Sequence, residues 1–236
     1  MTLDRRRFLT VSAATFSSAM LAACGANPRS ATKLLKTVEG ANEELERGLF
    51  RHDAMNSVPA SAQLAGKDFP TYFVSKHVPV WDPAARGPWR LEVSGAVRTP
   101  LSLSLDDLTH LPHITQKVDH FCVEGWNARA QWTGVRLSDI ARAAGLTGDA
   151  GYVDFQSFDD GYHESWDIDS ALHPQTLVAY GMDGRMLGVQ HGAPSRIHSP
   201  IKLGYKNTKY LTKIVFMPKP NGGYWSDEGY EWYGGT

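Results

Sequence analysis

The chain reads VDHFCVEGW at residues 118–126, and this stretch decides how the rest of the sequence is interpreted. Cys122, in its middle, is one of two cysteines, and the other, Cys24, lies in a predicted export signal. The exported body therefore has one thiol and no intramolecular disulfide partner for it. Such a thiol is either buried apolar filler or a ligand or nucleophile. The preceding residues predict a strand over 117–123 that delivers Cys122 near its end.

A single thiolate can supply one ligand to a metal, which is not enough to form a metal site by itself. It is a soft ligand for transition metals, whereas a structural zinc site needs about four protein ligands. Cys122 could therefore complete a metal whose other ligands come from an organic cofactor. A zinc hydrolase using His110, His113 and His120 is an alternative. It is poorly supported, because Pro112 breaks a helix and the first two rings need not share a face.

Length, composition and charge bound the class of protein. The 236 residues are 42% hydrophobic, which allows one good-sized domain or two small ones with a substantial core. The formal net charge is −1, so the sequence does not predict a nucleic-acid-binding surface.

The first residues predict export. RRRFL at residues 5–9 is a twin-arginine pattern, and the apolar stretch 8–23 is short for a spanning helix, which needs about 20 apolar residues. LAAC at residues 21–24 resembles a lipobox, in which Cys24 would be acylated. We therefore expect a twin-arginine signal with a lipobox over 1–23 and a periplasmic or otherwise extracytoplasmic lipoprotein, held to the membrane by its lipid. An uncleaved anchor and a soluble exported form are the alternatives.

The twin-arginine route carries folded proteins, and folding before export is needed when a cofactor is inserted in the cytoplasm. After the signal, residues 24–66 are interpreted as a linker and an amphipathic helix that packs on the main body, with membrane-surface binding as the alternative. The apolar residues that recur at helical spacing are Leu34, Val38, Ala41, Leu45 and Leu49. Residues 67–236 are predicted to form one mixed α+β domain.

Strands and turns predominate in this domain. Ser104 is placed to cap a short helix at 106–108, and Gly145 to end a helix over 137–144. The remaining predicted strands cover 89–93, 152–157, 162–166, 177–180 and 210–217. The second and third of these form a hairpin, so its carboxylates are interpreted as turn and solvated residues rather than acid–base catalysts: Asp159, Asp160 and Glu164.

Two later segments have the composition of phosphate-binding loops. In HGAPSR at residues 191–196, Gly and Pro shape a tight loop, and Arg196 offers a planar fork of donors. GYKNTKY at residues 204–210 adds two lysines, an amide and a hydroxyl around one glycine. Taken separately, each segment could equally be a solvated loop.

Together these segments resemble the sulfite oxidase family of molybdopterin enzymes. The likeness is to its bacterial branch, which includes the catalytic subunit of the periplasmic methionine sulfoxide reductase. It extends over roughly residues 69–233. The stretches that carry it are FVSKHVPV at 73–80, CVEGW at 122–126, WTGV at 132–135, the loops 191–196 and 205–210, and GYWSDEGY at 223–230.

The resemblance implies a sulfite-oxidase-type molybdopterin-binding domain with one Mo-molybdopterin per chain. Cys122 would be the protein ligand of molybdenum, and the Tyr180 hydroxyl would reach a metal oxo group or the substrate. The cofactor-binding residues that it implies are Phe73, Val74, Ser75, Lys76, His77, Cys122, Ser157, His191, Arg196, Asn207, Thr208 and Lys209.

The resemblance also implies two-electron oxygen-atom transfer on a small sulfur-containing substrate, by sulfite oxidation or sulfoxide reduction. Sulfite-oxidising members carry Arg where this chain has Ser75 and Glu124-Gly125, and dianionic sulfite needs fixed positive charge. Lys76, Arg129 and Lys206 could replace that charge, and Tyr180 favours the sulfite-type site, so both substrates stay open.

Electrons would be exchanged with a separate carrier, such as a cytochrome or a membrane haem protein. The dimerising C-terminal domain of larger relatives is not found in the sequence, so we expect a monomer. The alternative in another class is a non-catalytic lipoprotein that binds a small ligand on the same scaffold. The joint presence of Cys122, His191, Arg196 and Lys209 argues against it.

Overall fold

The computed structural model describes residues 37, 38, 40–42, 44–46, 48, 49, 54–159 and 161–236. The chain divides into two compact units, Met1–Gly48 and Leu49–Thr236. In the first unit, the described residues are helical, and the side chains of Val38 and Leu45 are 57% and 59% exposed. The predicted signal and lipobox, Cys24 and Leu34 lie outside the described residues. The packing of the amphipathic helix on the main body stays a prediction.

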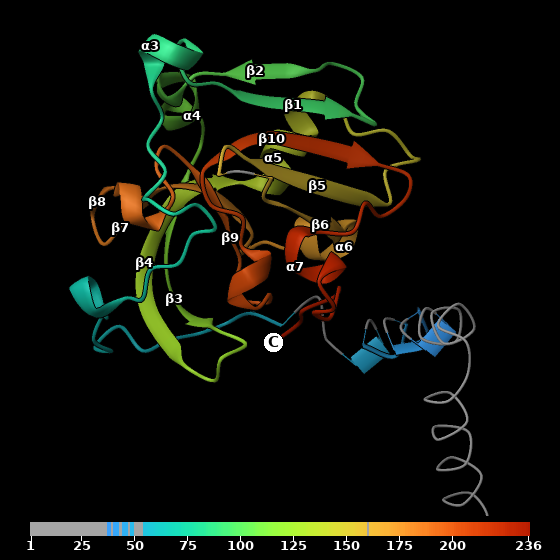
Figure 1. The fold of residues 1–236 in the computed structure, drawn as a ribbon, viewed down its shortest axis with the longest axis horizontal. Helices are drawn as coiled ribbons and strands as arrows, with labels where there is room; N and C mark the ends of the chain where they lie inside the picture. Colours follow the sequence, from blue (N-terminus) through green and yellow to red (C-terminus); the bar gives the residue numbers. More distant parts are fainter. Residues whose placement is uncertain (1–36, 39, 43, 47, 50–53, 160) are drawn as a thin grey trace, which may run out of the picture. The chain divides into compact units, whose positions relative to one another are not determined.

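Within residues 54–159 and 161–236, the backbone forms two five-stranded sheets (Figure 1). The order of the first sheet is β2 (Leu101–Leu103), β1 (Leu91–Gly95), β10 (Leu211–Met217), β5 (Tyr152–Ser157) and β6 (His163–Asp167). In this sheet, β1 and β10 are parallel and the other neighbouring strands are antiparallel.

The second sheet is antiparallel and is built on a long hairpin. β3 (Ile114–Phe121) pairs with β4 (Asn127–Arg136) along its whole length, and the hairpin extends away from the first sheet (Figure 1). β4 then pairs with β7 (Leu177–Met182), which also pairs with β8 (Arg185–Met186) and β9 (Arg196–His198).

Short helices precede, connect and follow these strands. They are η1 (Gly66–Asp68), α3 (Pro83–Arg86), α4 (Leu105–His110), α5 (Leu137–Ala144), α6 (Ile168–Ala171), η2 (Val189–His191), η3 (Gly204–Lys206) and α7 (Tyr224–Asp227). Among the described residues, no helix is long and apolar enough to cross a membrane. The predicted mixed α+β fold is confirmed, and the bounds 67–236 of its domain stay a prediction.

Local chemistry explains the helix ends that the sequence predicted. Ser104 Oγ accepts a hydrogen bond from Asp107 N (3.1 Å), and the Asp107 carboxylate accepts from Ser104 N (2.8 Å), which is a complete capping box for α4. Gly145 ends α5 in the left-handed conformation (φ 69°). The helix at 137–144 and the hairpin of β5 and β6 are confirmed.

The strand predicted over 117–123 needs correction. β3 begins earlier and ends at Phe121, so Cys122 begins the turn of the hairpin instead of lying in a strand. Gly125 N donates to Cys122 O (3.0 Å), and Cys122 N donates to Trp126 O (2.9 Å). Gly125 has a φ of 85°, which favours glycine. The backbone of Cys122 is therefore held by the hydrogen bonds of a tight turn and not by those of a strand.

Two apolar cores hold the sheets. The larger one packs α5 against the first sheet through residues such as Leu91, Ile140 and Phe155. The smaller one surrounds Trp132 of β4, which is fully buried, and contains Phe69. The segment that begins at Phe69 is thereby attached to the β3–β4 hairpin.

β4 and β7 approach each other closely at Gly134. A Cβ at this position would contact the Val178 carbonyl oxygen and lie 2.6 Å from Ala179 Cα, and backbone atoms cannot give way as a flexible side chain can. We expect Gly134→Ala to lower the free energy of unfolding by about 3 kcal/mol, measured by urea denaturation. Gly148→Ala, which meets nothing within 4 Å, should change it by less than about 0.5 kcal/mol. Equal stabilities would refute the close packing.

Candidate active site

A cavity of about 370 Å³ lies where five segments of the chain meet. The segment after η1, the Cys122 turn, the β5–β6 hairpin, the segment from β9 to β10 and the C-terminal segment all contribute to its lining. The structure brings seven of the residues that the sequence singled out to this one cavity: Phe73, Val74, Cys122, Ser157, Arg196, Asn207 and Lys209.

Cys122 is partly buried at the cavity wall. Its Sγ lies 3.9 Å from Glu124 Oε2, and the same carboxylate oxygen accepts a hydrogen bond from Trp126 Nε1 (3.1 Å). Burial raises the pKa of the Cys122 thiol, and the Glu124 charge adds to this effect. A bound metal cation would reverse it by stabilising the thiolate.

Arg196 lies on β9 with only 4% of its surface exposed. Its guanidinium donates to the carbonyls of Ile197 (3.2 Å), His191 (3.1 Å) and Asn207 (3.2 Å), and lies 4.9 Å from the centre of the Trp132 ring. Burial lowers the pKa of Arg196 to about 10, so the group keeps its charge at neutral pH. The carbonyls fix its position without neutralising it.

Lys209 supplies a second cation. Its Nζ donates to Gln190 O (3.0 Å), and burial, with the Arg196 charge, lowers the pKa of Lys209 to about 7. The approach requires Gly192 (φ 105°), because a Cβ there would lie 2.8 Å from Lys209 Cβ. Among the described residues, neither Lys209 nor Arg196 forms an ion pair with a carboxylate. Two mutually repelling cations on one cavity indicate a site for an anion.

The hairpin carboxylates were interpreted wrongly as solvated. Asp159 is 3% exposed and lines the cavity, where it accepts hydrogen bonds from Val74 N (2.8 Å) and Ser75 N (3.0 Å). Glu164 is fully buried and paired with Lys206 Nζ (2.6 Å). Other segments fold over this hairpin, which its turn-like composition did not indicate. Asp160 lies outside the described residues.

Of the other predicted cofactor residues, five do not line the cavity: Ser75, Lys76, His77, His191 and Thr208. Lys76 and His77 are exposed, and the Ser75 hydroxyl donates to Asp159. Thr208 is fully buried, and the His191 ring lies 5.6 Å from that of Phe69. The Asn207 side chain lines the cavity but is occupied by backbone groups: it accepts from Ser199 N (2.6 Å) and donates to Lys202 O and Leu203 O (both 3.0 Å).

Tyr180 and the cations considered as substitutes for arginine lie elsewhere. Tyr180 is 6% exposed on β7, packs within the larger core beside His113 and does not line the cavity. Arg129 pairs with Asp119 (2.8 Å), and Lys206 is occupied by Glu164. Arg196 and Lys209 are thus the lysine and arginine side chains that line the cavity among the described residues.

Sequence reasoning missed an aromatic rim. Tyr72 stacks on Trp126 with ring centres 6.1 Å apart, and Trp225 lies 5.2 Å from Tyr230. All four line the cavity. Three of them lie in the stretches that carried the resemblance and Tyr72 lies directly beside one, so their clustering there was the available signal. His120, two residues before Cys122, also lines the cavity, and burial lowers its pKa to about 3.

The residues present fit a molybdopterin. Its dithiolene and metal would meet the Cys122 thiol, its phosphate the two cations, and its ring system the aromatic walls. The Tyr210 hydroxyl is buried at the cavity with no hydrogen-bond partner among the described residues, as expected of a group that binds a ligand. Within the same residues, no three His, Cys, Asp or Glu side chains gather around a common point.

The family model of the oxidoreductase molybdopterin binding domain matches residues 76–225. The chain belongs to this family. It is therefore an oxidoreductase that uses molybdopterin, as the sequence predicted. The cavity and its cations lie within the matched region, apart from the wall before residue 76 and Tyr230.

Individual relatives of this molybdopterin oxidoreductase agree. A protein of Azospira oryzae, provisionally named protein-methionine-sulfoxide reductase subunit YedZ1, is 36% identical over 234 residues, covering 98% of this chain and 88% of the relative. The protein-methionine-sulfoxide reductase catalytic subunit MsrP of Xanthomonas campestris is 36% identical over 155 residues. That match covers 59% of this chain and 48% of MsrP, so the chain aligns with about half of such relatives.

The fold is also similar to a solved structure. The sulfane dehydrogenase SoxCD of Paracoccus pantotrophus superposes with a TM-score of 0.53 at 20% identity, over 56% of this chain and 39% of that chain. At this identity the likeness concerns the fold alone.

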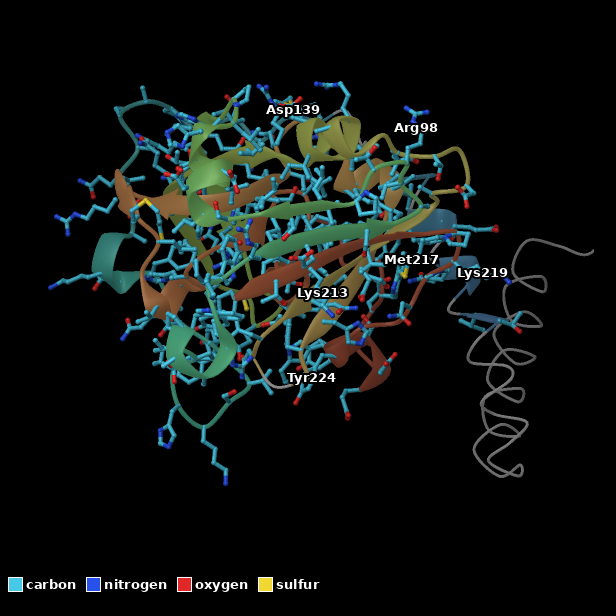
Figure 2. The ribbon with its side chains drawn as sticks, turned by 90° about the horizontal axis from the view of Figure 1, so that it is seen from above. Arg98, Asp139, Lys213, Met217, Lys219 and Tyr224 are labelled. Carbon is cyan, nitrogen blue, oxygen red and sulfur yellow. The ribbon has the colours of Figure 1, made fainter. Side chains whose placement is uncertain are left out.

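The lowered pKa of Lys209 predicts a pH dependence in cofactor-free protein. Between about 7 in the folded chain and about 10.4 in the unfolded chain, the unfolded state binds the extra proton, so stability rises with pH. We expect Lys209→Met to raise the free energy of unfolding most at pH 7 and below, with no gain near pH 10.4. The exposed residue Lys213 on β10 (Figure 2) is the control, since Lys213→Met should change stability by less than about 0.5 kcal/mol at any pH. Urea denaturation at several pH values measures both, and a pH-independent effect of Lys209→Met would contradict the charge argument.

Proposed function

We propose that this molybdopterin oxidoreductase reduces sulfoxides in an extracytoplasmic compartment. The observation that carries the proposal is the carboxylate of Glu124, 3.9 Å from the Sγ of the proposed metal ligand Cys122. A negative charge at this point disfavours the sulfite dianion and tolerates a neutral sulfoxide. The names of the relatives, protein-methionine-sulfoxide reductases, support the same substrate class.

The cofactor would be held from both ends. Cys122 would be the protein ligand of molybdenum, and Arg196 and Lys209 would bind the phosphate. Between them, the walls formed by Phe73 and Ser157 would contact the pterin. When bound, the cofactor supplies two-electron oxygen-atom transfer.

The rim of the cavity suits an apolar sulfoxide. Tyr72 is 55% exposed, Val123 47% and Tyr230 40%, so they present apolar surface beside the opening. Such surface would bind the alkyl part of a methionine sulfoxide side chain, and Glu124 would exclude anions. Tyr180 packs in the core and would act on the substrate only if the core rearranged, so we leave it out of the site.

The overall reaction shows that the protein needs a source of electrons. Reduction of a sulfoxide breaks the S–O bond and consumes two electrons and two protons, giving a thioether and water. The electrons must come from a separate redox protein, for which we propose a cytochrome or a membrane haem protein. The RRRFL and LAAC motifs support twin-arginine export and lipidation of Cys24, which would hold the enzyme beside such a carrier.

The domain organisation is proposed in the same terms. Residues 1–23 would be the signal, 24–66 a linker with its helix, and 67–236 the catalytic domain acting as a monomer. The family match over 76–225 lies within the last of these.

Metal analysis and a paired activity assay test the proposal. The full chain, expressed in a host that makes molybdenum cofactor, should carry about one molybdenum and one pterin per chain. With a reduced dye as electron donor it should reduce methionine sulfoxide, and with an oxidised dye it should oxidise sulfite much more slowly. Efficient sulfite oxidation would reverse the substrate assignment. Folded protein with no molybdenum and no pterin would favour the non-catalytic ligand-binding alternative.

Cys122→Ser should lower turnover at least about 100-fold, because a serine hydroxyl at neutral pH is not a soft anionic ligand. The pterin keeps its phosphate contacts, so pterin fluorescence per chain should stay near the wild-type value. Normal turnover in this variant would remove Cys122 from the mechanism.

Glu124→Gln should lower KM for sulfite about three- to tenfold, because it removes one negative charge beside the substrate site. KM for methionine sulfoxide should change less than twofold. Glu92→Gln, an exposed charge change on β1, is the matched control for net charge and should alter neither value. A KM for sulfite that does not respond to Glu124→Gln would remove the electrostatic argument for a neutral substrate.

A further inference from the structure

One wall of the cavity has no regular secondary structure. Residues 69–80 contain no helix or strand, and five of them line the cavity: Phe69, Pro70, Tyr72, Phe73 and Val74. We refer to residues 69–76 as the front wall. A wall without a helix or sheet ladder needs another means of satisfying its backbone and holding its position.

Asp159 provides that means. Its carboxylate accepts hydrogen bonds from Val74 N (2.8 Å) at Oδ2 and from Ser75 N (3.0 Å) at Oδ1, and the Ser75 hydroxyl donates to Oδ1 as well. Among the described residues, these are the hydrogen bonds that join backbone N–H groups of residues 70–80 to another part of the chain. At its base, the front wall is held by the packing of Phe69 in the smaller core.

The position of Asp159 is itself fixed by the hairpin. It follows β5, its backbone N donates to Ser157 Oγ (2.8 Å), and its carbonyl accepts from Tyr162 N (3.0 Å). The carboxylate is 3% exposed and lines the same cavity as Arg196 and Lys209. Donors from the front wall occupy both of its oxygens.

We propose that Asp159 is a positioning residue for the cofactor, which holds the front wall against the cavity and so retains the cofactor. Ser75 acts through Asp159 and does not contact the cofactor itself. The inference rests on the cofactor site proposed above. It assigns to the hairpin carboxylate a role that depends on the front wall and not on the chemistry at Cys122.

Cleavage by trypsin after Lys76 can report whether the front wall is attached. Lys76 is exposed and follows Ser75 directly, so trypsin can cleave after it once the wall detaches. Cleavage at this bond, followed by mass spectrometry, reports the position of the wall with or without cofactor. Molybdenum and pterin per chain after prolonged gel filtration report retention. Neither measurement depends on the activity of the loaded enzyme.

The experiment compares wild type, Asp159→Asn, Ser75→Ala and the double variant, each as the full chain. Asparagine keeps the size of the side chain, but its amide NH₂ group would face the backbone N–H groups of the front wall, and two donors cannot form a hydrogen bond. Asp107→Asn is the matched control, because Asp107 also accepts from a backbone N–H and a serine hydroxyl, at the remote helix α4. It should leave cofactor content and cleavage after Lys76 unchanged.

We expect Asp159→Asn to lose cofactor and to be cleaved after Lys76 about tenfold faster than wild type, and Ser75→Ala to show a smaller change in the same direction. The double variant should be no worse than Asp159→Asn, because both side chains belong to one interaction. If Asp159→Asn does not fold, Ser75→Ala still tests the wall, since it removes one donor of three.

Wild-type retention and protection in Asp159→Asn would overturn the proposal. So would additive effects in the double variant, or cofactor loss from Ser75→Ala without faster cleavage, because either would mean that Ser75 contacts the cofactor directly. Wild-type protein that carries no molybdenum would instead overturn the cofactor site on which the inference rests. That result can be told apart from a failure of the Asp159 proposal alone, in which the wild type carries cofactor and Asp159→Asn retains it equally well.

Discussion

A buried arginine and a partly buried lysine that share one cavity are the constraint on which the rest of the site depends. Arg196 and Lys209 repel one another, and burial removes the water that would screen them. The carbonyls of Ile197, His191, Asn207 and Gln190 hold them in place but do not neutralise them. Without an anion this arrangement costs stability. It is maintained because strands and tight loops fix both side chains, and an entering phosphate would turn the repulsion into attraction.

The same constraint explains the polar groups around the cavity. Asp159 brings one negative charge to it, yet its oxygens are occupied by the front wall. Glu164 is kept away by its buried pair with Lys206. The carboxylates are thus distributed so that each is satisfied locally, and the cations stay available to a ligand. Beside Cys122, Glu124 brings a further negative charge to the cavity.

Much of this could be predicted from the sequence, and the failures have physical causes. The helix over 137–144 was predicted with Gly145 as its end, and Cys122, Arg196 and Lys209 were predicted from residue chemistry within segments that carry a family resemblance. The role of Asp159 could not be predicted, because a turn composition is the same whether a hairpin is solvated or covered by a distant segment. Tyr180 was placed by resemblance alone, and its strand turns the ring into the core. Contacts such as those of Ser75 and Asp159, 84 residues apart, leave no local pattern.

The turn that begins at Cys122 has an evolutionary consequence. Its backbone is fixed by the Cys122–Gly125 and Cys122–Trp126 hydrogen bonds, none of which involves the side chains of Val123 or Glu124. Exchanging those two side chains therefore leaves the backbone hydrogen bonds of the turn in place, while a change at Glu124 removes its contacts with Cys122 Sγ and Trp126 Nε1. A lineage could change the charge and shape beside the reacting centre by substitutions at two adjacent codons while the scaffold, the thiol and the cations stay as they are. In the proposed site, selectivity and metal binding would in this sense be separately heritable, although the residues for both lie within one four-residue turn.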